Sequence, residues 1–307
     1  MKIVITGVCG LIGRRLASHL LSQGHDVFGV GRIKCKDIDA QPLINYVSID
    51  LSSRKSIDKL KEVIPVEIDL VIHCAAQQPR SNLLFRDYQK GNISTTENIT
   101  EWAKDVGIQT IISFSTVAFL DFPLKDGILV TELTNALPKN YYALSKWHSE
   151  SYLRLLGRDS DFSILCFRIP SLVHELQEGG LIHTFWNSAV ENIDLEIYDN
   201  GKFKRNLIYI DSIIEVVDMV LDRTLNFKGF ELYNIGSKDA WTLLSMAKYI
   251  YKEMNATAKI LPSSKKSPIQ GYWNLDTSKA EREIGFSPWG TKKILDTYMD
   301  NMRSKLE

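Results

Sequence analysis

Three residues in this chain have types and spacing that suit proton-transfer chemistry. Tyr142 and Lys146 are four residues apart in an expected helix and therefore face the same side of it. A nearby ammonium favours the phenolate and lowers the pKa of a tyrosine, which can then exchange a proton near neutral pH. Ser115 ends the expected strand 110–115, where its hydroxyl is positioned to hold a substrate carbonyl. The alternative is a surface pair of helix residues, because this spacing is common by chance.

Three glycines follow the first apolar segment of the chain. Residues 2–6 are apolar and β-branched, which predicts a buried strand. Gly7, Gly10 and Gly13 come next, and helical periodicity begins at Leu11. A strand that turns through glycines into a helix is typical of a phosphate-binding loop, because backbone N–H groups and the helix N-terminus attract an anion. The spacing G-x-x-G-x-x-G differs from the common G-x-G-x-x-G fingerprint, so an ordinary strand-to-helix turn is the alternative.

The end of the second expected strand, residues 27–31, bears on cofactor choice. A dinucleotide fold that prefers NAD places an acid there to hold the ribose hydroxyls. This chain has Arg32 and Lys34 instead. We therefore expect these cations to neutralise the 2′-phosphate of NADP, with Arg14 as a weaker addition. The alternative is a pair of solvated loop cations.

Strand and helix patterns alternate through the first half of the chain, which predicts βαβ units, a parallel sheet and ligands beyond the carboxyl ends of its strands. The expected strands are 2–6, 27–31, 46–51, 70–76, 110–115 and 163–168; the expected helices start near Leu11 or span 53–63, 87–106 and 141–156. After Pro170 the alternation becomes irregular. We predict an α/β fold with a Rossmann-type doubly wound parallel sheet in a dinucleotide-binding domain over residues 1–169. Residues 170–307 are expected to form a smaller, mainly substrate-binding portion, with segments that return to the first domain.

Composition excludes several function classes. The 307 residues contain 37 Lys and Arg and 37 Asp and Glu, so no overall charge favours nucleic acid or an anionic membrane. No apolar segment is long enough to span a bilayer, and the apolar N-terminus is too short for a signal peptide. The four cysteines show no metal-ligand spacing. We expect no metal site, reduced thiols and a cytoplasmic protein.

Further segments extend the pattern along the whole chain: Asp50-Leu51, His73-Cys74-Ala75-Ala76, Asn92, Arg168-Ile169-Pro170-Ser171 and residues 205–211, 233–236 and 276–280. Together with the glycine loop, Ser115, Tyr142 and Lys146, they resemble the extended short-chain dehydrogenase/reductase superfamily. The most similar branch is the NAD-dependent epimerase/dehydratase family that modifies nucleotide sugars. The resemblance covers essentially the whole chain, and its motifs occur in the same order.

The resemblance implies roles for individual residues. Asp50 and Leu51 would contact adenine, Lys146 would bind the nicotinamide ribose, and Arg205 would contact the diphosphate of a sugar nucleotide. The residues expected at the cofactor are Gly7, Gly10, Leu11, Ile12, Gly13, Arg32, Lys34, Asp50, Leu51, Cys74, Ala75, Ala76, Asn92, Tyr142, Lys146 and Pro170. Those expected at the substrate are Ser171, Arg205 and Lys266. A homodimer through the helices at 92–106 and 141–156 is implied by analogy.

Departures from the family pattern help to choose a reaction. Sugar-nucleotide 4,6-dehydratases follow the active-site hydroxyl with an Asp-Glu pair, whereas Thr116 and Val117 follow Ser115 here. Dehydration is therefore disfavoured. Val117 also replaces the cysteine of the epimerase–reductases that make GDP-fucose and cannot carry a proton. The family's V-Y-G after the serine is Ala118-Phe119-Leu120 here, which removes a tyrosine hydroxyl.

These observations predict an NADP-dependent reductase of a keto group, with the 4-keto group of a nucleotide-linked deoxysugar as the expected substrate. Tyr142 would donate the proton, Ser115 would hold the oxygen and Lys146 would tune Tyr142. Three alternatives stay open: a nucleotide-sugar 4-epimerase with retained NAD, an aldehyde or ketone reductase with a non-sugar substrate, and a non-catalytic cofactor-binding scaffold. The sequence does not identify the sugar, the base or the product stereochemistry.

Overall fold

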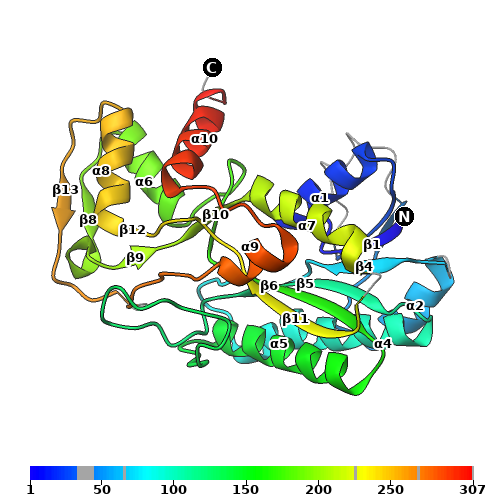
Figure 1. Cartoon of the computed structure of the whole chain (residues 1–307). Coiled ribbons are helices and arrows are strands. Elements are labelled where there is room, and N and C mark those ends of the chain that lie inside the picture. The colour runs from blue at the N-terminus through cyan, green and yellow to red at the C-terminus, as the bar shows by residue number, and fades with distance from the viewer. Residues whose placement is uncertain (33–44, 65–66, 225–226, 268–269, 306–307) are drawn as a thin grey trace. The chain divides into compact units, whose positions relative to one another are not determined.

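A computed structural model describes residues 1–32, 45–64, 67–224, 227–267 and 270–305 (Figure 1). The chain forms two compact units, each assembled from segments that are far apart in the sequence. Unit 1 comprises Met1–Phe119, Ala136–Arg168 and Ile214–Tyr233. Unit 2 comprises Leu120–Asn135, Ile169–Ile213 and Asn234–Glu307.

Unit 1 is built on a seven-stranded sheet in the order β11-β6-β5-β4-β1-β2-β3. The pairs β1–β2, β2–β3, β1–β4 and β4–β5 are parallel. The strands are β1 Lys2–Thr6, β2 Asp26–Gly31, β3 Asn45–Ser48, β4 Leu70–His73, β5 Thr110–Thr116, β6 Ser163–Ile169 and β11 Gly229–Asn234. The order runs outward in both directions from β1 and β4, so the carboxyl ends of these two strands border the topological switch point, where such sheets bind ligands. The predicted Rossmann-type fold is confirmed.

The helices of unit 1 connect these strands, and Figure 1 shows α4 and α5 together on one side of the sheet and α1 on the other. Their bounds are α1 Leu11–Ser22, α2 Ser56–Val63, α3 Phe85–Tyr88, η2 Gln89–Ser94, α4 Thr95–Asp105 and α5 Tyr141–Asp159, and α7 Ile210–Thr224 enters unit 1 from unit 2. The single helix predicted over 87–106 is interrupted by η2, which is a π-helical turn. Such turns are frequent at functional sites.

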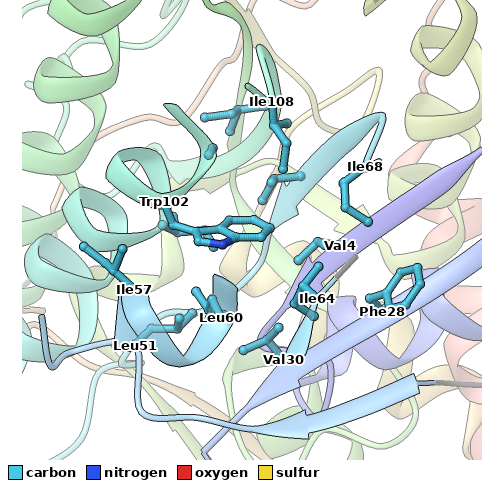
Figure 2. Close-up of a cluster of buried hydrophobic side chains, with 14 of the residues drawn as sticks. Val4, Phe28, Val30, Leu51, Ile57, Leu60, Ile64, Ile68, Trp102 and Ile108 are labelled. Atoms are coloured by element: carbon cyan, nitrogen blue, oxygen red, sulfur yellow. The ribbon is translucent and has the colours of Figure 1, made fainter. Parts of the chain in front are cut away.

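A cluster of buried apolar side chains fixes the sheet against α2 and α4 (Figure 2). Trp102 of α4 is 1% exposed and lies close to Leu60 of α2. Val4 and Val30 contribute the facing side chains from β1 and β2. Complete burial of a side chain of this kind stabilises the fold by roughly 2–3 kcal/mol. The packing therefore holds the strands whose ends carry the candidate site.

Unit 2 consists of short strands and helices, in agreement with the irregular pattern seen after Pro170. Strand β7 Ser171–Val173 pairs in parallel with β10 Leu207–Tyr209, β8 Leu195–Ile197 pairs in parallel with β13 Ile260–Pro262, and β9 Lys204–Arg205 pairs antiparallel with β12 Trp241–Thr242. The remaining elements are α6 Leu181–Val190, η3 Tyr198–Gly201, α8 Leu243–Glu253, α9 Ser278–Ile284 and α10 Thr291–Arg303. Among the described helices of both units, none has the length and apolar character needed to cross a membrane.

The cysteines differ in oxidation state. Cys74 and Cys166 are free thiols, whereas Cys9 is disulfide-bonded. The expectation of reduced thiols is therefore wrong at Cys9. Spacing along the chain does not show which sulfur atoms meet in space, because pairing depends on the separation of Cα atoms in the folded protein.

Candidate active site

The glycine loop joins β1 to α1 and requires two of its glycines. Gly7 has φ +65°, and a Cβ at this position would lie 2.7 Å from Cα of Ala75. A Cβ at Gly13 would lie 2.4 Å from the carbonyl oxygen of Gly7. A side chain at either position would collide with backbone, so the loop needs glycine for its turn and for its close approach to the segment after β4.

The N-terminus of α1 suits an anion. Its N-cap is Gly10, and within the described residues no side chain caps this end and no acid stands in the first turn. The N–H groups at the start of a helix lack intrahelical partners, so those near Leu11 and Ile12 are suited to phosphate oxygens. The cradle at Gly7, Gly10 and the helix end therefore fits the pyrophosphate of a dinucleotide.

The ends of β2 and β3 carry the residues predicted to select and hold the adenosine half. Arg32 follows β2 directly and is exposed, while Lys34 lies outside the described residues. Asp50 is also exposed, and its Oδ1 accepts a hydrogen bond from the N–H of Ser52 at 3.0 Å. Leu51 is buried in the core cluster, and its carbonyl accepts a bond from the Asn98 amide at 2.7 Å. Asp50 is thus accessible, whereas Leu51 is also part of the core.

Asn92, in the π-helical turn, ties the segment after β4 to helix α5. Its Oδ1 accepts a hydrogen bond from the backbone N–H of Gln77 at 2.6 Å. Its Nδ2 donates to Oγ of Ser145 at 2.7 Å, and that hydroxyl donates to the carbonyl of Tyr142 at 2.8 Å. Because Asn92 is 2% exposed, it acts by holding these backbones. Cys74, Ala75 and Ala76 are half-buried in the segment it fixes.

Helix α5 presents Tyr142 to the end of β5. Oδ1 of Asn140 caps the helix by accepting the N–H of Ala143 at 2.8 Å, which sets the register. Tyr141 is consequently exposed, whereas the Tyr142 side chain lies near that of Thr116. Burial raises the pKa of Tyr142 to about 12, with Thr116 opposing that rise and Tyr88 adding to it.

Lys146 has a backbone partner at the end of β5. Its Nζ donates to the backbone carbonyl of Phe114 at 2.7 Å, and burial lowers the pKa of its ammonium group. The causes of the Tyr142 pKa shift are burial, Thr116 and Tyr88, so the tuning of Tyr142 by Lys146 stays a prediction. Spacing brings the two residues to one helix face, but the direction of a long lysine side chain depends on the partner it finds.

Two adjacent hydroxyls at the end of β5 differ in their surroundings. Ser115 is 5% exposed, and among the described residues its Oγ has no hydrogen-bond partner. Oγ of Thr116 accepts the N–H of Ala118 at 3.1 Å, and the Thr116 side chain lies near Tyr142. Sequence reasoning missed Thr116, although successive residues of a strand point to opposite faces and only one of the two could face α5. The sequence contains no signal that decides between them.

Arg205 is the central cation of unit 2 and is 6% exposed. Its Nη1 donates to the carbonyls of Lys204 at 2.8 Å and Gly271 at 2.6 Å, and its guanidinium lies 4.5 Å from the centre of the Trp273 ring. Burial lowers the pKa of Arg205 to about 10, and the negative charge of Asp199 opposes this change. Arg205 is therefore still a cation at neutral pH.

The other residues predicted to bind substrate in unit 2 lie in different surroundings. Lys266 is largely exposed, with Nζ 3.4 Å from Oδ1 of Asp199. Ser171 is half-buried on β7 and lines a small pocket with His183 and Tyr298. Pro170, predicted at the cofactor, is buried in unit 2. Within the described part of the chain, no group of three His, Cys, Asp or Glu side chains is arranged to hold a metal ion.

Comparison with known proteins gives consistent matches. Residues 3–236 match the sequence profile described as the NAD dependent epimerase/dehydratase family. A putative UDP-glucose 4-epimerase of Methanocaldococcus jannaschii is 23% identical over 98% of this chain and 100% of that protein. A UDP-2-acetamido-2,6-beta-L-arabino-hexul-4-ose reductase of Pseudomonas aeruginosa is 24% identical over 74% of this chain and 51% of that protein. The UDP-glucose 4-epimerase structure from Thermotoga maritima superposes with a TM-score of 0.87 at 18% identity, covering 100% of both chains.

Proposed function

Because the chain belongs to the NAD dependent epimerase/dehydratase family, we propose that it is an NADP-preferring reductase of the 4-keto group of a nucleotide-linked deoxysugar. Membership confirms the resemblance seen in the sequence and makes the chain an NAD(P)-dependent enzyme. The names of relatives with reductase and epimerase activities on nucleotide sugars support this substrate class. The cofactor preference is supported by Arg32, which stands exposed directly after β2.

The protonation state of Tyr142 is compatible with the reductase. A reductase must deliver a proton to a carbonyl oxygen, whereas an epimerase must begin by removing a proton from a hydroxyl. Burial raises the pKa of Tyr142 to about 12, so the hydroxyl carries its proton at physiological pH, as a proton donor must.

The residues around Tyr142 supply the other requirements of the proton transfer. The nicotinamide cofactor, when bound, supplies the hydride for the carbonyl carbon. Tyr142 donates its hydroxyl proton to the carbonyl oxygen and is left as a phenolate. We propose that the Thr116 hydroxyl, whose Oγ accepts the N–H of Ala118 at 3.1 Å, donates to the Tyr142 oxygen and stabilises the phenolate as it forms. We assign this role to Thr116, whereas the sequence alone had suggested Ser115 as the active hydroxyl.

The residue after Thr116 argues against elimination. Val117 is fully buried and apolar, so it supplies neither an acid nor a base. A dehydratase needs such a group to remove water from the sugar. In unit 2, Arg205 and Lys266 are proposed to bind the diphosphate of the substrate, because a guanidinium fork matches phosphate oxygens.

The test separates the reductase from its alternatives. Protein is purified and denatured, the released NAD(H) and NADP(H) are assayed, and NADPH absorbance is then followed with a 4-keto nucleotide sugar. We expect little retained cofactor and stoichiometric oxidation of NADPH. Retained NAD with sugar interconversion and no net NADPH consumption would establish the epimerase instead. Turnover of simple ketones but not of the nucleotide sugar would establish a non-sugar reductase, and cofactor binding without turnover of any of these substrates would indicate a non-catalytic scaffold.

A further inference from the structure

A buried histidine lies between the glycine loop and the helices behind it. His73 is the last residue of β4 and is 5% exposed. Its Nδ1 lies 2.7 Å from Oγ of Thr6, and its Nε2 lies 3.1 Å from Oγ of Thr96. Each ring nitrogen therefore has a hydroxyl partner, one on β1 and one on α4.

The hydrogen bonds of the two threonines determine which nitrogen carries the proton. The Thr96 hydroxyl donates to the carbonyl of Asn92 at 2.7 Å, so its oxygen must accept a proton from Nε2 of His73. Nδ1 is then unprotonated in the neutral ring and accepts from the Thr6 hydroxyl. Oγ of Thr6 in turn accepts the backbone N–H of Ala75 at 3.2 Å. All four bonds are satisfied by a single neutral tautomer. Burial and the nearby Lys146 ammonium favour this state, because they lower the pKa of His73 to about 3.

The network connects both sides of the proposed cofactor cradle. Thr6 immediately precedes Gly7, whose Cα is packed so closely on Ala75 that a Cβ there would lie 2.7 Å from it. At the other end, Asn92 holds the N–H of Gln77 at 2.6 Å. The glycine loop and the segment after β4 are thus joined through one buried ring.

We propose that His73 is a positioning residue for the dinucleotide, whose Nε2-protonated neutral ring holds the glycine loop and the Ala75–Gln77 segment in the geometry that binds the cofactor. This inference rests on the proposed placement of the cofactor at the glycine loop. His73 does not touch the reacting atoms. It acts through Thr6 and Thr96, so removing either hydroxyl should loosen the cradle without changing its surface.

Isosteric pairs of variants test the proposal. Thr6→Val keeps the side-chain shape but leaves Nδ1 of His73 and the Ala75 N–H unpartnered, and we expect cofactor Kd to rise about tenfold. Thr96→Val should raise it about fivefold, because the effect passes through the ring. Thr6→Ser and Thr96→Ser retain the hydroxyl and should stay within about twofold of wild type. Kd is measured by NADPH quenching of tryptophan fluorescence.

A neighbouring threonine supplies the matched control. Thr100 lies one turn further along α4, is buried, and its hydroxyl bonds to the carbonyl of Thr96 at 3.0 Å and to Tyr152 at 3.0 Å rather than to the ring. Thr100→Val should lower the urea unfolding midpoint and leave cofactor Kd unchanged. If Thr6→Val and Thr96→Val lower the midpoint in the same way and also leave Kd unchanged, the role of the network is structural and the proposal is overturned.

Two further measurements distinguish failure of this inference from failure of the proposed function. Nitrogen-15 NMR of the apoprotein should show protonated Nε2 and unprotonated Nδ1 for His73 between pH 5 and 9, and the opposite tautomer would overturn the proposal. UDP affinity should be unaltered by Thr6→Val, because the residues proposed to bind it belong to unit 2. If the wild type binds neither NADPH nor NADH, the proposed function itself fails, whichever tautomer is found.

Discussion

In unit 1 the candidate proton donor is a neutral hydroxyl, whereas in unit 2 the candidate diphosphate-binding groups, Arg205 and Lys266, are cations. Burial raises the pKa of Tyr142, whose hydroxyl is therefore protonated, and Arg205 stays charged because burial lowers its pKa only to about 10, opposed by the negative charge of Asp199. The difference indicates that unit 1 contributes to the chemical step and unit 2 to substrate binding. Changes around Tyr142 should alter turnover, because they change the energy of proton transfer, while changes around Arg205 should alter affinity for an anion.

The candidate lysines of the two units also differ in their exposure to solvent. Nζ of Lys146 is inside unit 1 and donates to the Phe114 carbonyl, whereas Lys266 in unit 2 is 72% exposed beside Asp199. A buried ammonium needs fixed acceptors, since water cannot solvate it. An exposed one is screened by solvent and contributes little to binding. The contrast predicts large kinetic effects in unit 1 and small ones at the exposed end of unit 2.

The largest effect should come from removing the proposed proton donor. Tyr142→Phe should lower kcat by about 10²–10⁴-fold, which is the usual contribution of a positioned general acid. Tyr141→Phe is the matched control, because Tyr141 is exposed on the same turn of α5. Steady-state kinetics with NADPH and a 4-keto nucleotide sugar measure both. Equal losses in the two variants would show that the register of this helix has been assigned wrongly.

The folded protein should lose stability in acid because His73 is buried as a neutral ring. Its pKa is lowered from 6.5 to about 3 on folding, so the unfolded chain takes up the proton first as pH falls. The associated stability is fully present above about pH 6.5 and is lost as pH approaches 3, which corresponds to about 3 kcal/mol between pH 7 and pH 4.

The check for His73 is urea unfolding of wild type and His73→Gln at these two pH values. Wild type should lose more stability between them than the variant does, whatever the stability of the variant at pH 7. Identical losses would mean that His73 titrates normally in the folded protein.

Removal of each of the two hydroxyls at the end of β5, those of Ser115 and Thr116, should have clearly different effects on kcat. Thr116→Val removes the hydroxyl proposed to donate to Tyr142 and should lower kcat by about 10²-fold, comparable with the loss of one donor to a developing charge. Ser115→Ala removes an oxygen with no described partner and should leave kcat within about threefold of wild type. The opposite order would return the active hydroxyl to Ser115.

Cofactor choice should depend on Arg32. A charge-assisted bond to a 2′-phosphate is worth roughly 1.5–3 kcal/mol, so Arg32→Ala should weaken NADPH binding by about 10–100-fold. NADH lacks that phosphate and serves as the control ligand on the same variant, with less than about a twofold change expected. Fluorescence titration gives both Kd values. A wild type that binds NADH more tightly than NADPH would contradict the cofactor proposal.

The smallest effect should come from Lys266. Because this side chain is largely exposed, Lys266→Ala should weaken UDP binding only about two- to fivefold, and less at high salt. Lys265→Ala is the control, since Lys265 is similarly exposed but paired with Glu196 at 2.9 Å. Calorimetric titration with UDP measures both variants. If the two substitutions act equally, the effect is one of general surface charge.

Much of unit 1 was predictable because its elements are encoded locally. Residues 2–6 and 110–115 lie in β1 and β5 as their apolar, β-branched pattern indicates. Boundaries were harder: β4 ends at His73 where a strand through Ala76 was expected, because the segment after it is held by side-chain bonds to Thr6 and Asn92. The sequence did not show that residues 229–234 form β11 at the edge of the sheet, because this strand pairs with β6, which is distant in the sequence.

By itself, the sequence determined the residue types and spacings whose meaning is local. Gly7 and Gly13 allow a turn and a close approach that only glycine permits, and Tyr142 and Lys146 share a helix face because the helix repeats every 3.6 residues. Tertiary structure decided which groups these residues meet. It paired Tyr142 with Thr116, directed Lys146 to the Phe114 carbonyl and enclosed His73 between two threonines. Partners and pKa values depend on burial and on contacts between distant segments, and no spacing along the chain specifies them.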